Sequence, residues 1–206
     1  MSGELPAQLD LLDWKRRVFE LYAEVRLAQN PESGWHRWRE ARDEIFANHR
    51  QSPLPEGARS GFPGLSYFEY DAGQRILAEV VGAEPQVYDI ATSGEDVGSY
   101  RFTRFAVARF DLAGRSRELE LYWLEGYGGG LFLPFRDATS GKSTYGAGRY
   151  LLDTVKGADL GMEADRLVLD FNFAYNPSCA YDPRWVCPLS PPPNRLDIPI
   201  EAGERN

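Results

Sequence analysis

The sequence predicts a mainly β fold of the α+β class. Two N-terminal amphipathic helices precede a curled antiparallel sheet, or a partly closed β-barrel or sandwich, of about eight strands. Apolar residues recur at three- and four-residue steps up to about residue 49 and alternate with polar residues from about residue 62 onward. The alternating segments are short, are separated by Gly, Pro, Asp and Ser, and mostly have no helical pattern between them. This organisation favours antiparallel pairing, and a barrel above all.

The helices are predicted over residues 8–28 and 31–49. The apolar stripe of the first consists of Leu11, Trp14, Val18, Leu21, Tyr22 and Val25. Asn30 and Pro31 then form an N-cap followed by proline at the first helical position. The stripe of the second helix consists of Trp35, Trp38, Ala41 and Ile45. Because a helix is stabilised mostly by burying such a face, both stripes are interpreted as core contacts.

The strands are predicted from alternation between turn residues. They cover residues 65–70, 75–81, 86–91, 100–112, 117–124, 131–135, 148–152 and 166–173. The clearest hairpin joins 100–112 to 117–124 through a turn at residues 113–116. Within 117–124, one predicted face carries Leu119, Leu121 and Trp123, and the other carries Glu118, Glu120 and Tyr122.

Composition and charge limit the classes of function. The chain of 206 residues is expected to form one compact unit, with a helical segment at 1–60 packed on a β domain at 61–206. Its net charge is −8, of which −7 lies after residue 60, so nucleic acid is a poor partner. The first ten residues lack the features of a signal peptide, and no run of 18 apolar residues occurs. We therefore expect a cytoplasmic protein that does not associate with a membrane.

Three short motifs suggest familiar chemistry, and none satisfies its requirements. Gly141-Lys142-Ser143 resembles the end of a P-loop, but Arg136 stands where the first glycine is needed. Residues 126–130 are glycine-rich but precede a strand rather than a helix, so they are interpreted as a turn. The two histidines, His36 and His49, have neither zinc-ligand nor triad spacing. The sequence therefore predicts no metal site and no cofactor.

Polar residues are concentrated late in the chain, around segment 135–150 and the strand at 166–173. In that strand Asp170 and Asn172 share one face, opposite Phe171 and Phe173. If this face points into a barrel mouth, an arginine can pair with Asp170 or hold a ligand carboxylate. A buried Arg–Asp network that only stabilises the C-terminal loop is an equally good interpretation. The candidate ligand-binding residues are Arg136, Asp137, Thr144, Tyr145, Arg149, Asp170, Asn172, Tyr175 and Asn176.

The cysteines, Cys179 and Cys187, lie eight residues apart in a proline-rich region. Three interpretations remain open: buried free thiols, a local disulfide, or a redox pair formed by a nucleophile and a resolving partner. Spacing alone does not decide among them.

Six late segments carry a resemblance to a known family: 133–141, 144–151, 169–181, 187–189, 194–196 and 200–204. With Trp38, Arg42, 52–54 and 64–68, they resemble the bacterial family catalogued as domain of unknown function 1684. The resemblance covers about residues 35–204 and leaves 1–30 outside. It implies that the polar positions matter and implies no reaction. Some members look secreted or lipid-anchored, which would suit a Cys179–Cys187 disulfide.

Three classes of function follow from these residues. The first is a binding protein that holds a small polar or anionic ligand in one cavity lined by the candidate residues. The second is a cofactor-independent hydrolase or lyase with Asp137 or Asp170 as general base and an arginine that stabilises negative charge. The third is an interaction protein, for example a homodimer formed through residues 8–28.

Overall fold

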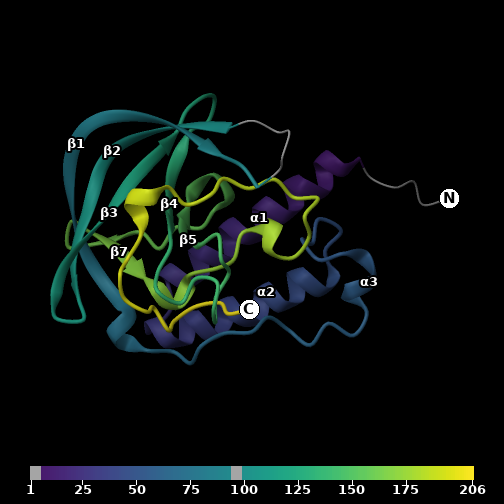
Figure 1. Ribbon diagram of the computed structural model, residues 1–206. Helices are drawn as coiled ribbons and strands as arrows, with labels where there is room; N and C mark the ends of the chain where they lie inside the picture. The colour runs from purple at the N-terminus through teal and green to yellow at the C-terminus, as the bar shows by residue number, and fades with distance from the viewer. Residues whose placement is uncertain (1–5, 94–98) are drawn as a thin grey trace.

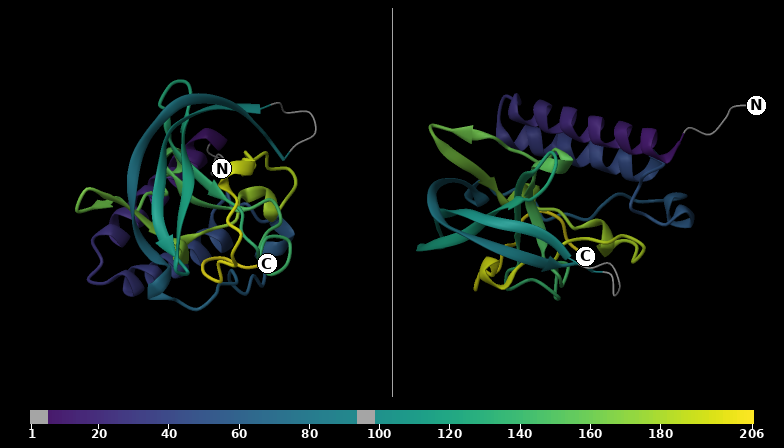
Figure 2. Two further views of the ribbon diagram at one scale, coloured as in Figure 1. Left: turned by 60° about the vertical axis from the view of Figure 1, so that its left-hand side comes forward. Right: turned by 90° about the horizontal axis from the view of Figure 1, so that it is seen from above.

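Two helices form one layer of the computed structural model, which describes residues 6–93 and 99–206. They are α1 (Ala7–Arg26) and α2 (Pro31–Asn48), and they lie against the sheet as Figure 2 shows. Asn30 Oδ1 accepts a hydrogen bond from Ser33 N at 2.8 Å, which confirms the predicted N-cap of the second helix. A single further turn, α3 (Glu56–Arg59), follows. None of these helices is long and apolar enough to cross a bilayer. Residues 1–5, half of the segment on which the signal-peptide expectation rests, lie outside the described residues.

The described strands form one antiparallel sheet in the order β5-β4-β3-β2-β1-β7-β6. Their bounds are β1 Arg75–Ala91, β2 Ser99–Leu112, β3 Arg115–Leu124, β4 Gly130–Phe135, β5 Arg149–Asp153, β6 Met162–Glu163 and β7 Arg166–Asp170. Figure 1 shows how strongly β1, β2 and β3 curl. The mainly β, α+β class is therefore confirmed. Within the described ranges β5 and β6 end the sheet and do not pair with each other, so the closed barrel that the strand pattern favoured is wrong; the outer side of β5 is bridged only by isolated residues such as Tyr175.

Three strand predictions differ from the structure. Segment 65–70 forms only an isolated bridge, between Tyr67 and Glu204. The strands predicted at 75–81 and 86–91 are one bent strand, β1, whose pairing with β2 is interrupted between Gly82 and Gln86. Strand β7 ends at Asp170, and the next three residues form a 3₁₀ turn. A break in pairing and the end of a strand look alike in sequence, because both interrupt alternation.

The predicted hairpin is confirmed, with a tighter turn. Leu112 pairs with Arg115, so only Ala113 and Gly114 form the turn, with φ of 53° and 72°. Positive φ at both positions matches the twist of a two-residue hairpin. The faces of β3 differ from expectation at one end. Tyr122 is buried and Trp123 is 46% exposed, because a separate apolar cluster that includes Phe102 and Phe132 covers the opposite face of the sheet there.

The core has three parts. The largest lies between the sheet and segment 194–204, which contributes Leu196, Ile200 and Ala202. The second joins the helices to β7 through Trp35, Trp38, Val168, Phe173 and neighbouring residues. The third contains Ile90, Phe102, Tyr122, Phe132 and Tyr150. The helices thus share a core with the sheet, and the boundary at residue 60 stays a prediction.

Candidate functional site

Arg149, the first residue of β5, lies inside the protein and contacts the C-terminal segment. Its Nη2 is 3.0 Å from Asp137 Oδ2, and each of the two side chains is 1% exposed. Its terminal nitrogens also donate to the carbonyl oxygens of Ile200, at 2.9 Å, and of Glu204, at 3.2 Å, as well as to that of Ala202. Burial lowers the pKa of Arg149, and the charge of Asp137 opposes this effect. The two terminal nitrogens are occupied by this chain's own acceptors, whereas Nε has no hydrogen-bond partner among the described residues.

Asp137 is equally occupied. Its Oδ1 accepts hydrogen bonds from Thr139 N at 2.7 Å and from Ile200 N at 3.3 Å. The Thr139 hydroxyl also contacts this carboxylate and lies 2.8 Å from Thr144 Oγ1. Asp137, Thr144 and Arg149 therefore belong to one closed network. This is the alternative in which the Arg–Asp pair stabilises the C-terminal segment.

Asp170 and Asn172 lie elsewhere, beneath the helices. Asp170 Oδ1 accepts from Asn172 N at 3.0 Å and from Asn172 Nδ2 at 2.8 Å. Asn172 also exchanges hydrogen bonds with the backbone of Asp71 and accepts one from Trp35 Nε1. The face that sequence reasoning placed in a barrel mouth is instead covered by α2, and Asn172 connects β7 to that helix.

Asp170 is one of four candidates with a buried side-chain polar atom that has no hydrogen-bond partner among the described residues; the others are Arg136, Arg149 and Asn176. The Asp170 side chain is 1% exposed, and among the described residues its Oδ2 has no hydrogen-bond partner. Burial raises its pKa to about 6, although hydrogen bonds from Asn172 and the charge of Arg75 act in the opposite direction. It lines a cavity of about 380 Å³, here called the polar cavity, together with Arg26, Asn30, Arg75 and Glu163.

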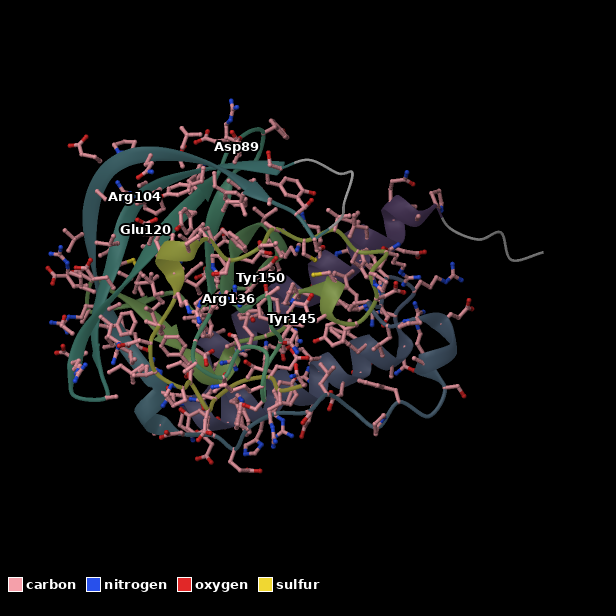
Figure 3. All side chains as sticks on the ribbon, viewed as in Figure 1. Asp89, Arg104, Glu120, Arg136, Tyr145 and Tyr150 are labelled. Carbon is pink, nitrogen blue, oxygen red and sulfur yellow. The ribbon has the colours of Figure 1, made fainter. Side chains whose placement is uncertain are left out.

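The remaining candidates are dispersed. Tyr175 pairs with Tyr150 through its backbone, and Asn176 N donates to Glu204 Oε2 at 3.0 Å. Tyr175 and Asn176 both line a small cavity of about 70 Å³. The backbone of Arg136 pairs with that of residues 194–196. Glu120, which forms an ion pair with Arg104, contacts the same residue as Arg136, because Asn194 hydrogen-bonds the backbones of both (Figure 3).

The expectation that all nine residues share one cavity is therefore wrong. Asp170 and Tyr175 line different cavities, and Arg149 is engaged with Asp137. The physical reason is the strand order. Four strands separate β5, which carries Arg149, from β7, which carries Asp170. Closeness in sequence after residue 130 does not bring these side chains together.

A larger cavity, of about 480 Å³, was not predicted. It lies between the first half of α1, the ends of β2, β3 and β4, and segment 178–188. Its apolar walls include Trp14, Phe102, Leu124, Phe132 and Trp185, and its polar groups include Lys15, Gln51, Asp153 and Lys156. We call it the apolar cavity. In sequence its aromatic residues are indistinguishable from core residues, and the one available signal is that it holds two of the chain's three lysines.

Cys187 also lines the apolar cavity. Both cysteines are free thiols in the structure. Cys179 N donates to Cys187 Sγ at 3.4 Å, and the Tyr145 hydroxyl lies 3.7 Å from Cys179 Sγ. The described ranges contain no cluster of three His, Cys, Asp or Glu side chains that could hold a metal ion.

Comparison with known proteins supplies a family. The model of a family described as a protein of unknown function, DUF1684, matches residues 60–205. The chain belongs to the DUF1684 family. It is also similar to the solution NMR structure of an uncharacterised protein from Haloarcula marismortui. That match has 39% identity and a TM-score of 0.61, and it covers 85% of this chain and 94% of the other. No curated protein matches the chain significantly.

The family match confirms the resemblance found in the sequence and begins later than expected, at residue 60 rather than about residue 35. The matched part of this DUF1684 protein contains the Arg149 network, both cysteines and Asp170. Helix α1, which forms one wall of the apolar cavity through Leu11, Trp14 and Lys15, precedes that part.

Proposed function

We propose that this DUF1684 protein binds a small molecule with an apolar body and an acidic group in the apolar cavity. Ligand sites are typically concave, mostly apolar spaces of about 300–1,000 Å³ with a few polar groups that fix orientation. The observation that carries the proposal is a space of about 480 Å³ with mainly apolar walls and two lysines. This proposal replaces the arginine-lined site expected from sequence, because Arg149 is already occupied.

The charge of the cavity supports an acidic ligand. Among the described residues, Lys15 and Lys156 line it and Asp153 is the one carboxylate, with Oδ2 3.3 Å from Lys156 Nζ. These described lining residues carry an excess of one positive charge in a protein whose net charge is −8. A ligand carboxylate can pair with the lysine that Asp153 leaves free, while its chain contacts Phe102 and Phe132. A medium-chain fatty acid has this chemistry.

The test is a fluorescence titration with anilinonaphthalene sulfonate, which combines aromatic rings with an anionic group, followed by displacement with decanoate. We expect decanoate to compete and Leu124→Trp, which fills the cavity, to abolish binding. Val87→Trp, at an exposed site on β1, is the matched control. Equal binding by both tryptophan variants would place the probe outside the cavity and overturn the proposal.

The lysines provide a second comparison. Lys15→Met removes the lysine that Asp153 leaves free in the cavity, whereas Lys142→Met removes the one lysine that does not line it and is exposed. A charge-assisted contact is worth about 1.5–3 kcal/mol, so Lys15→Met is expected to raise the Kd for decanoate about tenfold or more. The affinity for uncharged decanol should stay unchanged. The same loss in Lys142→Met would contradict a specific role for the cavity lysines.

One observation favours a second function, an enzyme that uses Asp170 as general base. A buried carboxyl with a pKa of about 6, a free Oδ2 and Arg75 nearby has the features of a catalytic carboxylate in a polar cavity. Asp137 is not proposed in this role because Arg149 and Thr139 occupy its oxygens. The test is ester hydrolysis over a panel of nitrophenyl esters. Asp170→Asn should abolish a rate that rises through pH 6 while leaving decanoate binding intact, and an unchanged rate would eliminate Asp170 as the base.

A further inference from the structure

The two cysteines are held face to face by the segment that contains them. Cys179 lies in a 3₁₀ turn, Ser178–Ala180, and its backbone N is 3.4 Å from Cys187 Sγ. Since this nitrogen is one bond from the Cα of Cys179, that Cα lies within about 5 Å of Cys187 Sγ, and the two thiols share a side-chain hydrogen bond. The chain has no other cysteine that could compete for either thiol.

Hydrogen bonds fix the position of Cys187. Its backbone N and Ser93 Oγ are 3.1 Å apart, and its carbonyl oxygen accepts from Ser93 N at 3.0 Å. The next carbonyl, that of Pro188, accepts from the Tyr150 hydroxyl at 2.5 Å. These contacts join the Cys187 segment to the end of β1 and to β5. The segment that carries Cys187 is therefore anchored where its sulfur contacts the backbone of Cys179.

The two thiols differ in environment. Cys179 is partly exposed, and Cys187 is buried. Hydrogen bonding from Cys187 lowers the pKa of Cys179 to about 6, with smaller contributions from Ser93 and Tyr145, although partial burial acts in the opposite direction. The hydrogen bond with Cys179 and burial raise the pKa of Cys187. One residue is thus the accessible nucleophile, and the other is a protonated thiol beside it.

We propose that Cys179 and Cys187 form a redox site that reduces a hydroperoxide and closes as a disulfide. The Cys179 sulfur attacks one peroxide oxygen, the O–O bond breaks, and the departing oxygen takes a proton to leave as water or an alcohol. Cys179 becomes a sulfenic acid. The Cys187 sulfur then attacks the Cys179 sulfur, an S–S bond forms, the S–O bond breaks, and a water molecule leaves with the proton from Cys187. One hydroperoxide is reduced and two thiols are oxidised.

This site is independent of ligand binding, although the two adjoin. Cys187, Trp185 and Pro188 belong to the wall of the apolar cavity. The proposal stands on the placement of two thiols and needs no occupant of that cavity.

The experiment is mass spectrometry of the intact protein after treatment with one equivalent of hydrogen peroxide. We expect the mass to fall by two hydrogen atoms, a peptide map to join residues 179 and 187, and dithiothreitol to reverse the change. In Cys187→Ser the reaction should stop at a sulfenic acid that dimedone traps. Cys179→Ser should remain unmodified by the same single equivalent.

A readout on the wild-type protein guards against misfolding of the variants. Its rate of alkylation at Cys179 by iodoacetamide should reach half its maximum near pH 6. As a separate check, Tyr145→Phe should move this midpoint upward. Three results would overturn the proposal: equal reaction of both serine variants with peroxide, disulfides formed only between molecules, or an alkylation midpoint in the ordinary cysteine range of about 8.5.

Discussion

Arg149 and Asp137 form an ion pair that is almost completely hidden from water, with Nη2 3.0 Å from Oδ2. The pair joins the start of β5 to the turn after β4 and, through carbonyl contacts, to residues 200–204. We therefore expect this buried network to contribute to the stability of the folded protein.

Asp137→Asn is expected to destabilise the protein by about 3–5 kcal/mol, because it leaves a buried guanidinium without its counter-charge. The measurement is urea unfolding. Glu118→Gln is the matched control, since it breaks the exposed Arg109–Glu118 pair, whose value is about 0–1 kcal/mol. Similar losses of unfolding free energy in both variants would show that the buried Arg149–Asp137 pair stabilises the protein no more than an exposed pair does.

Asp170 makes stability depend on pH. Its pKa is about 6 in the folded protein and 3.8 when unperturbed, so between these values the native state binds a proton that the unfolded chain has released. Through Asp170, the free energy of unfolding therefore increases by about 3 kcal/mol in total as the pH falls from about 7 to about 4. Urea unfolding of Asp170→Asn should lack this increment, while Asp111→Asn on the surface should retain it. Identical pH profiles for the wild type and Asp170→Asn would contradict the raised pKa.

Gly203 occupies a position that no other residue fits. Its φ is +76°, and an added Cβ would lie 2.5 Å from the carbonyl oxygen of Ala174 and 2.7 Å from that of Phe171. Gly203→Ala should lower the melting temperature sharply, with a loss of at least about 1–3 kcal/mol. Gly57→Ala, in α3, meets nothing within 4 Å and should change stability by no more than a few tenths of a kcal/mol. A harmless Gly203→Ala would mean that segment 200–204 can move away from β7.

The homodimer expected through residues 8–28 stays a prediction, and α1 offers a way to test it. Leu9, Leu12 and Phe19 are three and seven residues apart, which places them on one face of the helix, and each is about half exposed. If this stripe is a subunit interface, light scattering should give twice the chain mass for the wild type and the chain mass for Leu12→Glu. Leu27→Glu, beyond the end of α1, should stay dimeric, and a monomeric wild type would eliminate the dimer.

The elements were largely predictable because local rules decide them. Asn30 and Pro31 mark the start of α2, and the sheet keeps the predicted hairpin with its turn at Ala113 and Gly114. Both signals depend on residues within a few positions of each other. The break in β1 between Gly82 and Gln86 was mistaken for the end of a strand. Whether the chain continues in the same strand after such a break depends on its pairing with β2, which comes later in the sequence.

The site was less predictable, because it depends on which surface covers each side chain. Alternation predicted Asp170 and Asn172 on one face of a strand, whereas β7 ends at Asp170 and Asn172 lies in the 3₁₀ turn that follows, where its carbonyl oxygen accepts from Trp35 of α2. Similarly, the spacing of Cys179 and Cys187 left three interpretations open, and the fold of the segment between them brings the thiols together. The cavity beneath α1 has no sequence pattern of its own, since wall and core residues are of the same kinds.

The carbonyl contacts of Arg149 also bear on how the chain folds during synthesis. The guanidinium becomes buried only when the carbonyl groups of residues 200, 202 and 204 are in place, about 50 residues after Arg149 itself. Until that stretch has left the ribosome, Arg149 and Asp137 must stay hydrated and the sheet must stay open on the side that Ile200 fills. Folding of the core is therefore expected to finish after translation has reached residue 204, with a nascent chain that exposes apolar strands in the meantime.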